Sequence, residues 1–136
     1  MSLAARWMAA ICAAVLAGCA AGLADGSAAP PSLEATRWVM AGAKSDAVSP
    51  PRLEFTREGR VTGYTGCNQL GGSYRLEGDR LDVVAATTKR ACLCPGGDAE
   101  SRLLAVLADR PRVRLGAGKL VLTGASGTRF EFDAVK

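Results

Sequence analysis

Histidine is absent from this 136-residue chain, and aromatic residues make up only 5% of it. Without histidine, neither a Ser-His nor a Cys-His catalytic pair can form, and no imidazole can bind a metal ion. The net charge is only +4, and the basic residues are not interleaved with aromatic ones, as binding to nucleic-acid bases requires. We therefore expect a non-enzymatic protein with no catalytic residues, no cofactor, no metal and no nucleic-acid partner.

The chain also lacks a hydrophobic run long enough to cross a membrane. Residues 7–17 form an apolar run of 11 residues, whereas a transmembrane helix needs about 20. A run of this length behind the basic residue Arg6 is typical of a signal peptide. It ends in the sequence Leu16-Ala17-Gly18-Cys19, which resembles a bacterial lipobox.

The lipobox resemblance implies that residues 1–18 are a lipoprotein signal peptide and that the Cys19 thiol receives a diacylglycerol group. Because two or three acyl chains anchor a protein stably, we expect a membrane attachment through Cys19. Residue 20 is alanine rather than aspartate, which implies a lipid-anchored protein of the cell envelope, at the outer membrane facing the periplasm in a bacterium with two membranes. The alternative is an ordinary secretory signal that releases a soluble protein.

Residues 19–32 are mostly small, with two prolines at positions 30 and 31. Such a segment cannot bury a core, so we interpret it as a flexible tether. The remaining residues, 33–136, are enough for one domain with a modest core.

Within this domain, apolar and polar side chains mostly alternate, and turn-forming residues separate the alternating runs. A period of two predicts half-buried antiparallel strands. We predict eight strands, at residues 36–41, 52–56, 60–64, 72–76, 80–84, 112–115, 119–123 and 128–133.

One segment has a helical period instead. From Asp98 to Asp109, apolar residues recur at the spacing of a single helix face, with Asp98 as a plausible N-cap and Pro111 beyond the end. The predicted fold class is therefore mainly β (α+β). We expect a strongly bent antiparallel sheet, or a small open barrel, of about eight strands with one helix packed on it.

A longer motif spans residues 53–74. It reads Leu53-x-Phe55-x-x-x-Gly59-x-Val61-x-Gly63-x-x-Gly66-Cys67-Asn68-x-x-x-Gly72-x-Tyr74. Three further elements keep a consistent order around it: Trp38, the run Thr88-Lys89-Arg90-Ala91-Cys92, and Glu100-x-x-Leu103-Leu104-x-x-Leu107. Together they resemble the META domain, the family of the heat-shock protein HslJ, over essentially all of residues 33–136.

The resemblance implies a bacterial envelope lipoprotein that is associated with stress or heat shock and has no established catalytic activity. We therefore expect a monomer that binds or stabilises an unidentified envelope protein or small ligand. The alternative is a periplasmic inhibitor or small-ligand carrier that uses the mouth of the barrel. The residues themselves favour a structural role for the motif, because its glycines and Asn68 suit a tight reversal and Tyr74 suits a core.

The family pattern contains two cysteines, which correspond to Cys67 and Cys92, and it implies a disulfide between them. Three alternatives stay open for Cys94: it competes for Cys67, it is buried and inert, or it is a free reactive thiol. A thiol-redox or soft-metal site formed by Cys67, Cys92 and Cys94 is a further alternative, although the domain offers no fourth cysteine as a ligand.

Two groups of charged residues have a functional and a structural interpretation. Glu77, Asp79 and Asp82 are near a predicted turn, where we favour a solvated hairpin end over a Ca²⁺ site. Arg110, Arg112 and Arg114 would share one strand face and could meet anionic lipid headgroups, but we favour an outward polar face.

Overall fold

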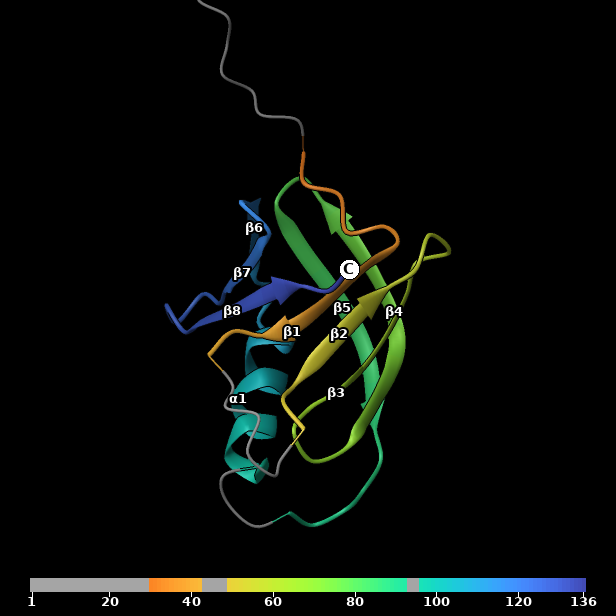
Figure 1. Cartoon of the computed structure of the whole chain (residues 1–136), viewed down its shortest axis with the longest axis vertical. Helices are drawn as coiled ribbons and strands as arrows, with labels where there is room; N and C mark the ends of the chain where they lie inside the picture. The colour runs from red at the N-terminus through yellow and green to blue at the C-terminus, as the bar shows by residue number, and fades with distance from the viewer. Residues whose placement is uncertain (1–29, 43–48, 93–95) are drawn as a thin grey trace, which may run out of the picture.

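The computed structural model of this chain describes residues 30–42, 49–92 and 96–136. Eight strands pair antiparallel in chain order around a closed barrel, and one helix is inserted between the fifth and sixth (Figure 1). The elements are β1 (Thr36–Met40), β2 (Arg52–Phe55), β3 (Arg60–Tyr64), β4 (Gln69–Glu77), β5 (Arg80–Thr87), α1 (Gly96–Ala108), β6 (Arg112–Gly116), β7 (Lys119–Thr123) and β8 (Arg129–Ala134). The predicted fold class is confirmed, with a closed barrel in place of an open one.

The barrel closes because β1 pairs with both β2 and β8, the last strand. The longest strand pairing in the barrel is between β4 and β5, and its register runs from Leu70↔Thr87 to Glu77↔Arg80. The shortest pairing is at the junction of β5 and β6, which we call the β5–β6 seam. Arg80↔Arg112 is the single registered pair there among the described residues. Two backbone hydrogen bonds flank that pair, from Leu81 N–H to the Pro111 oxygen (3.0 Å) and from Val113 N–H to the Asp79 oxygen (2.7 Å).

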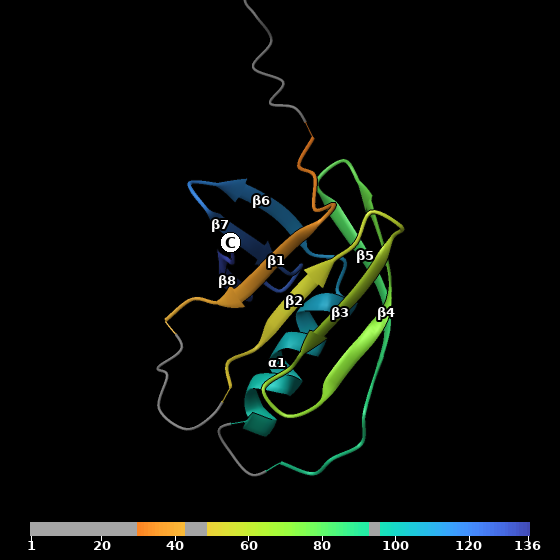
Figure 2. The same cartoon turned by 45° about the vertical axis from the view of Figure 1, so that its right-hand side comes forward.

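The barrel interior is filled by side chains, as expected for eight strands. Phe55, Val61, Leu81, Leu120 and Phe132 are fully buried at its centre. Helix α1 covers the lower end in Figures 1 and 2 and contributes Leu103, Val106 and Leu107 to the same core. At the other end, the segment before β1 buries Leu33.

The strand and helix boundaries agree with the alternation except around the β4–β5 hairpin. Both of its strands are longer than predicted, because glycines and consecutive small residues interrupt the pattern where ladder hydrogen bonds still form. The helix begins at Gly96, so Asp98 lies in its first turn and is not the N-cap. With 13 residues, α1 is too short to span a membrane, and it is the one helix that the described residues contain.

Candidate functional site

The Gly-Cys-Asn motif forms the tight turn between β3 and β4. Gly66 has a φ of 97°, in the left-handed region that glycine adopts readily. The Thr65 hydroxyl oxygen accepts the N–H groups of Cys67 (3.3 Å) and Asn68 (2.9 Å), and the Thr65 N–H donates to the Asn68 oxygen (2.9 Å). Thr65 therefore holds the turn, a role that we had expected of the Asn68 side chain.

The Asn68 side chain instead reaches two other parts of the chain. Its Oδ1 accepts hydrogen bonds from the Thr88 hydroxyl (2.9 Å) and the Arg90 N–H (2.8 Å). Its Nδ2 donates to the Arg90 carbonyl (3.1 Å) and to Glu100 Oε2 on α1 (3.0 Å). Since an amide can make about four hydrogen bonds, this buried side chain is fully satisfied.

Glu100 completes the cluster from the first turns of α1. Its carboxylate accepts the hydroxyl proton of Thr65 as well as the amide proton of Asn68. In the sequence, Glu100 was named only as the first residue of the Glu100-x-x-Leu103-Leu104-x-x-Leu107 element. Thr65 carried no signal, because an isolated threonine beside a glycine is common in turns.

A disulfide joins Cys67 to Cys92, 25 residues apart, with their Cα atoms 5.8 Å from each other. It links the same turn to the same pre-helix segment as the Asn68 hydrogen bonds. We call Thr65–Asn68, Thr88–Cys92 and Glu100 the motif clasp. Because the disulfide consumes the thiols of Cys67 and Cys92, it leaves neither of them as a thiolate for a soft metal.

The motif clasp is a closed structural unit. No buried side-chain nitrogen or oxygen among the described residues lacks a hydrogen-bond partner. The buried polar groups of the clasp therefore have their partners within the chain. Several residues of the family motif lie in it, among them Gly66, Cys67, Asn68, Thr88 and Cys92.

Three further residues of the family motif, Trp38, Gly72 and Tyr74, lie in the barrel wall and core. Trp38 is buried and donates its indole N–H to the Thr36 hydroxyl (2.8 Å). Tyr74 packs edge-on against Phe55, with ring centroids 4.9 Å apart, and donates its hydroxyl to the Thr56 carbonyl (2.8 Å). Burial, and then the charges of Glu34 and Glu58, raise the pKa of Tyr74.

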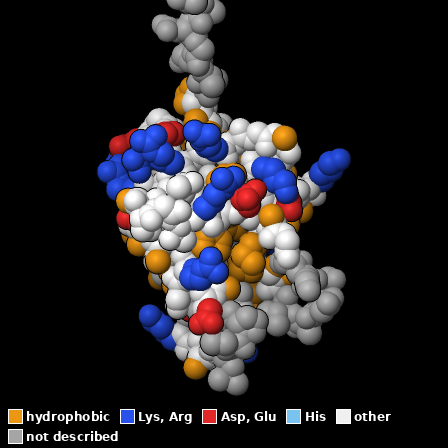
Figure 3. All heavy atoms as spheres, turned by 90° about the vertical axis from the view of Figure 1, so that its left-hand side faces the viewer, with side chains coloured by type: hydrophobic (Ala, Val, Ile, Leu, Met, Phe, Trp, Pro, Cys, Tyr) orange, Lys and Arg blue, Asp and Glu red, His pale blue; other side chains and the backbone are white. Residues whose placement is uncertain are grey.

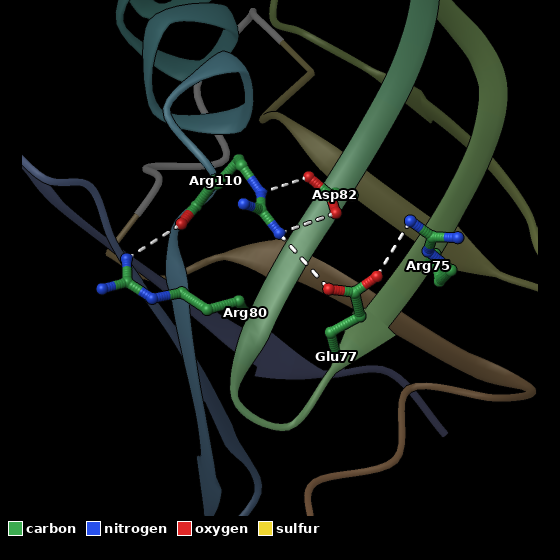
Figure 4. A network of polar contacts seen from close by, with 5 residues as sticks. All are labelled: Arg75, Glu77, Arg80, Asp82 and Arg110. Atoms are coloured by element: carbon green, nitrogen blue, oxygen red, sulfur yellow. Dashed lines mark hydrogen bonds and ion pairs between the residues drawn. The ribbon is translucent and has the colours of Figure 1, made fainter.

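A surface network of charges spans the β5–β6 seam (Figure 4). Arg110 forms a bidentate pair with Asp82, at 2.5 Å and 3.0 Å, and contacts Glu77 at 3.5 Å. Glu77 also pairs with Arg75 (2.8 Å), and Arg80 donates to the Arg110 carbonyl (3.2 Å). The Asp82 contact raises the pKa of Arg110. The carboxylates of Glu77, Asp79 and Asp82, near the turn between β4 and β5, therefore each form an ion pair with an arginine.

The arginine stripe that we predicted is interrupted. Arg110 precedes β6 and has a φ of 47°, so it does not share a strand face with Arg112 and Arg114. On the face shown in Figure 3, basic side chains are interspersed with acidic ones. Ion pairs join Arg112 to Asp79, Lys119 to Asp133 and Arg129 to Glu131. This distribution is typical of an outward polar face.

The outer wall of the barrel carries a recess of about 630 Å³. Residues of β1, β2, β3 and the start of β4 line it, with Val135 at one side. The mouths of the barrel are less suited to a small ligand, because Leu33 and α1 fill the two ends. Cys19, Cys94 and most of the predicted tether lie outside the described residues.

The closed eight-stranded barrel with one inserted helix is a fold that other proteins share. The META domain family model matches residues 31–136. The chain belongs to the META domain family. No curated protein gives a significant match.

Solved structures show the same fold. An NMR structure of a protein from Burkholderia xenovorans is similar, with 29% identity and a TM-score of 0.64, over 76% of this chain and 84% of that one. A second NMR structure has 23% identity and a TM-score of 0.64, over 74% of this chain and 90% of that one. A crystal structure of a DUF4847 family protein from Bacteroides vulgatus has 10% identity and a TM-score of 0.55, over 75% and 93%. The last two support the fold alone.

Proposed function

We propose that this protein is a non-enzymatic lipoprotein of the bacterial envelope, anchored through Cys19, whose barrel binds or stabilises an envelope partner under stress. Membership of the META domain family carries the proposal, since no catalytic activity is established for that family. The lipobox-like sequence before Cys19 supports the anchor.

The packing of the barrel supports a role that depends on its outer surface. The core cluster fills the interior from Leu33 to the helix residue Leu107. The buried hydrogen-bonding groups of the motif clasp are engaged within the chain. A partner is therefore expected to meet the strands and loops from outside.

The anchor is tested by labelling cells with radioactive palmitate and fractionating their membranes. We expect the wild-type chain to incorporate label and to sediment with the envelope, and Cys19→Ser to do neither. Cys12→Ser is the matched control, because Cys12 is within the segment expected to be removed. Unlabelled wild-type protein, or labelled Cys19→Ser, would contradict the anchor.

The binding role is tested by chemical crosslinking in intact cells, followed by purification of the protein from envelope extracts. We expect a specific envelope protein to be enriched with the anchored wild type and depleted with Cys19→Ser. Deletion is expected to lower survival during heat or envelope stress. If no protein is enriched and survival is unchanged, the proposed function is wrong.

A further inference from the structure

The barrel has an unpaired strand edge along the second half of β5. β6 pairs with β5 only near its beginning, at Arg80, and then diverges from it (Figure 2). β4 covers the opposite edge of β5 along its whole length. From Val83 to Thr87, no strand of the described residues lies beside the outer edge of β5.

The backbone groups of this edge point outward. Leu81 donates its N–H across the seam to Pro111, and strand residues two apart present their N–H and C=O groups to the same side. The same groups of Val83, Ala85 and Thr87 therefore face away from β4. No backbone partner for these three N–H groups exists within the described parts of the chain.

Helix α1 contacts β5, but the side chains along this edge remain accessible to solvent. Val84 is 77% exposed, the most exposed large apolar side chain of the described residues, and Ala85 and Ala86 are also exposed. Natural proteins protect free edges with charged residues, prolines or bulges. Here none of the residues between Asp82 and Lys89 is charged or a proline.

The outer face beside the edge is hollowed. A recess of about 460 Å³ lies against the β4–β5 hairpin, and its lining residues are Ser73, Tyr74, Arg75, Asp82, Val83 and Val84. A side chain of an added strand would reach this recess from the edge, which provides specificity beyond the backbone hydrogen bonds.

We propose that the β5 edge, residues 83–87, binds an extended peptide segment of a partner protein as an added antiparallel strand. This inference rests on the proposed binding function and gives it a surface and a class of partner. Lys89 and Arg90 are exposed just beyond the edge. An antiparallel strand brings its N-terminal end beside them, so the partner segment carries acidic residues there, followed by β-branched residues.

A second copy of this chain fits the edge less well. An edge of five residues buries far less than the roughly 1,600 Å² of a typical stable interface. Pairing two copies of β5 antiparallel about Ala85 also brings Arg80 of one copy opposite Arg90 of the other. Like charges opposite one another destabilise a strand pair.

The test uses the full chain carrying Cys19→Ser, labelled with ¹⁵N, and the synthetic peptide acetyl-EEVTVTV-amide. We expect the peptide to shift and slow the exchange of the Val83, Ala85 and Thr87 amides. The amides of Val84 and Ala86 already bond to β4 and should change little. Ala85→Pro removes one edge donor and should weaken binding roughly ten-fold, whereas the matched variant Ala85→Ser should bind as the wild type does.

Two altered peptides keep the test independent of how the proline variant folds. A peptide N-methylated on the residues that face β5 should not bind, and one with lysines in place of the two glutamates should bind more weakly. Equal binding of either peptide, or unchanged edge amides, overturns the proposal. So does concentration-dependent protection of these amides without peptide, which would identify a second copy as the occupant. Because the variant lacks Cys19, failure here leaves the anchor and the crosslinking test unaffected.

Discussion

The Asn68 side chain connects the β3–β4 turn to the pre-helix segment and to α1. It bonds to the pre-helix segment at Thr88 and Arg90 and to α1 at Glu100. Because Asn68 is only 2% exposed, water cannot readily replace its hydrogen bonds. A buried donor or acceptor that loses its partner costs about 1–3 kcal/mol. Asn68 therefore stabilises the fold by providing partners for several buried groups at once.

We expect Asn68→Ala to destabilise the protein by about 2–4 kcal/mol, because the Arg90 N–H and the Glu100 carboxylate lose a partner simultaneously. Chemical denaturation with wild type and variant measures the change. The neighbouring Gln69→Ala is the control, since the Gln69 side chain is exposed. Equal midpoints for Asn68→Ala and Gln69→Ala would show that the clasp is not a stabilising unit.

Tyr74 predicts a pH dependence at the alkaline end. Its pKa lies above the usual 10 because burial, Glu34 and Glu58 favour the neutral phenol. The stabilisation from this shift is complete below about pH 10 and is lost as the pH rises through the folded-state pKa. We expect thermal stability to fall more steeply between about pH 9 and pH 12 for the wild type than for Tyr74→Phe. Parallel curves would contradict this assignment.

In the β4–β5 hairpin, the strands approach so closely at Gly72 that no side chain would fit there. A Cβ on Gly72 would lie 2.6 Å from the Ala85 Cα and closer still to the Val84 oxygen, whereas a Cβ on Gly71 would meet nothing within 4 Å. The two glycines are neighbours in sequence, and Gly72 alone allows the close approach of the strands.

Gly72→Ala should therefore force β4 and β5 apart and destabilise the protein by about 1–3 kcal/mol, the usual cost of overpacking. Gly71→Ala should be neutral or slightly stabilising, because a strand glycine costs backbone entropy. Thermal unfolding of both variants compares the two positions directly. Equal melting temperatures would show that the hairpin adjusts without cost.

This hairpin also shows why some strand bounds could not be predicted from the sequence. Strands such as β3 and β7 match their predicted bounds, because Val61 and Leu120 point inward between less buried neighbours. The beginning of β4 has adjacent glycines and the end of β5 has adjacent alanines, so neither contains a period of two. The unpaired edge lies in this part of β5, where side-chain patterns carry no information about strand pairing.

Only part of the motif clasp could be predicted from the sequence. The family pattern indicated Cys67, Asn68, Thr88 and Cys92, and the structure gathers them into one cluster. The contact between Thr65 and Glu100 joins residues 35 positions apart. Contacts of that kind depend on the packing of α1 against the sheet, which local spacing does not specify.

At the scale of the whole molecule, the disulfide stabilises a small domain. A bridge that closes a loop of 25 residues contributes roughly 3 kcal/mol. For a domain of about 100 residues, losing it lowers the melting temperature by on the order of 15 °C. We expect Cys67→Ser to show this loss under oxidising conditions.

Cys92→Ser separates the remaining alternatives for Cys94. If Cys94 replaces Cys92 as the partner of Cys67, Cys92→Ser will be more stable than Cys67→Ser and will contain one disulfide by mass spectrometry. Equal loss in both variants means that Cys94 does not form the bridge. A wild-type protein whose melting temperature is unchanged by a reductant would contradict the stabilising role.

The pairing of β1 with β8 has a consequence for the connectivity of the domain. Trp38 is opposite Ala134, and the Val135 N–H donates to the Arg37 oxygen, so the two ends of the folded chain lie side by side. A short linker could join them into a covalent ring without breaking any ladder. New ends could then be opened at an exposed turn such as residues 125–127. The present order of strands is thus one of several circular permutations that would build the same barrel.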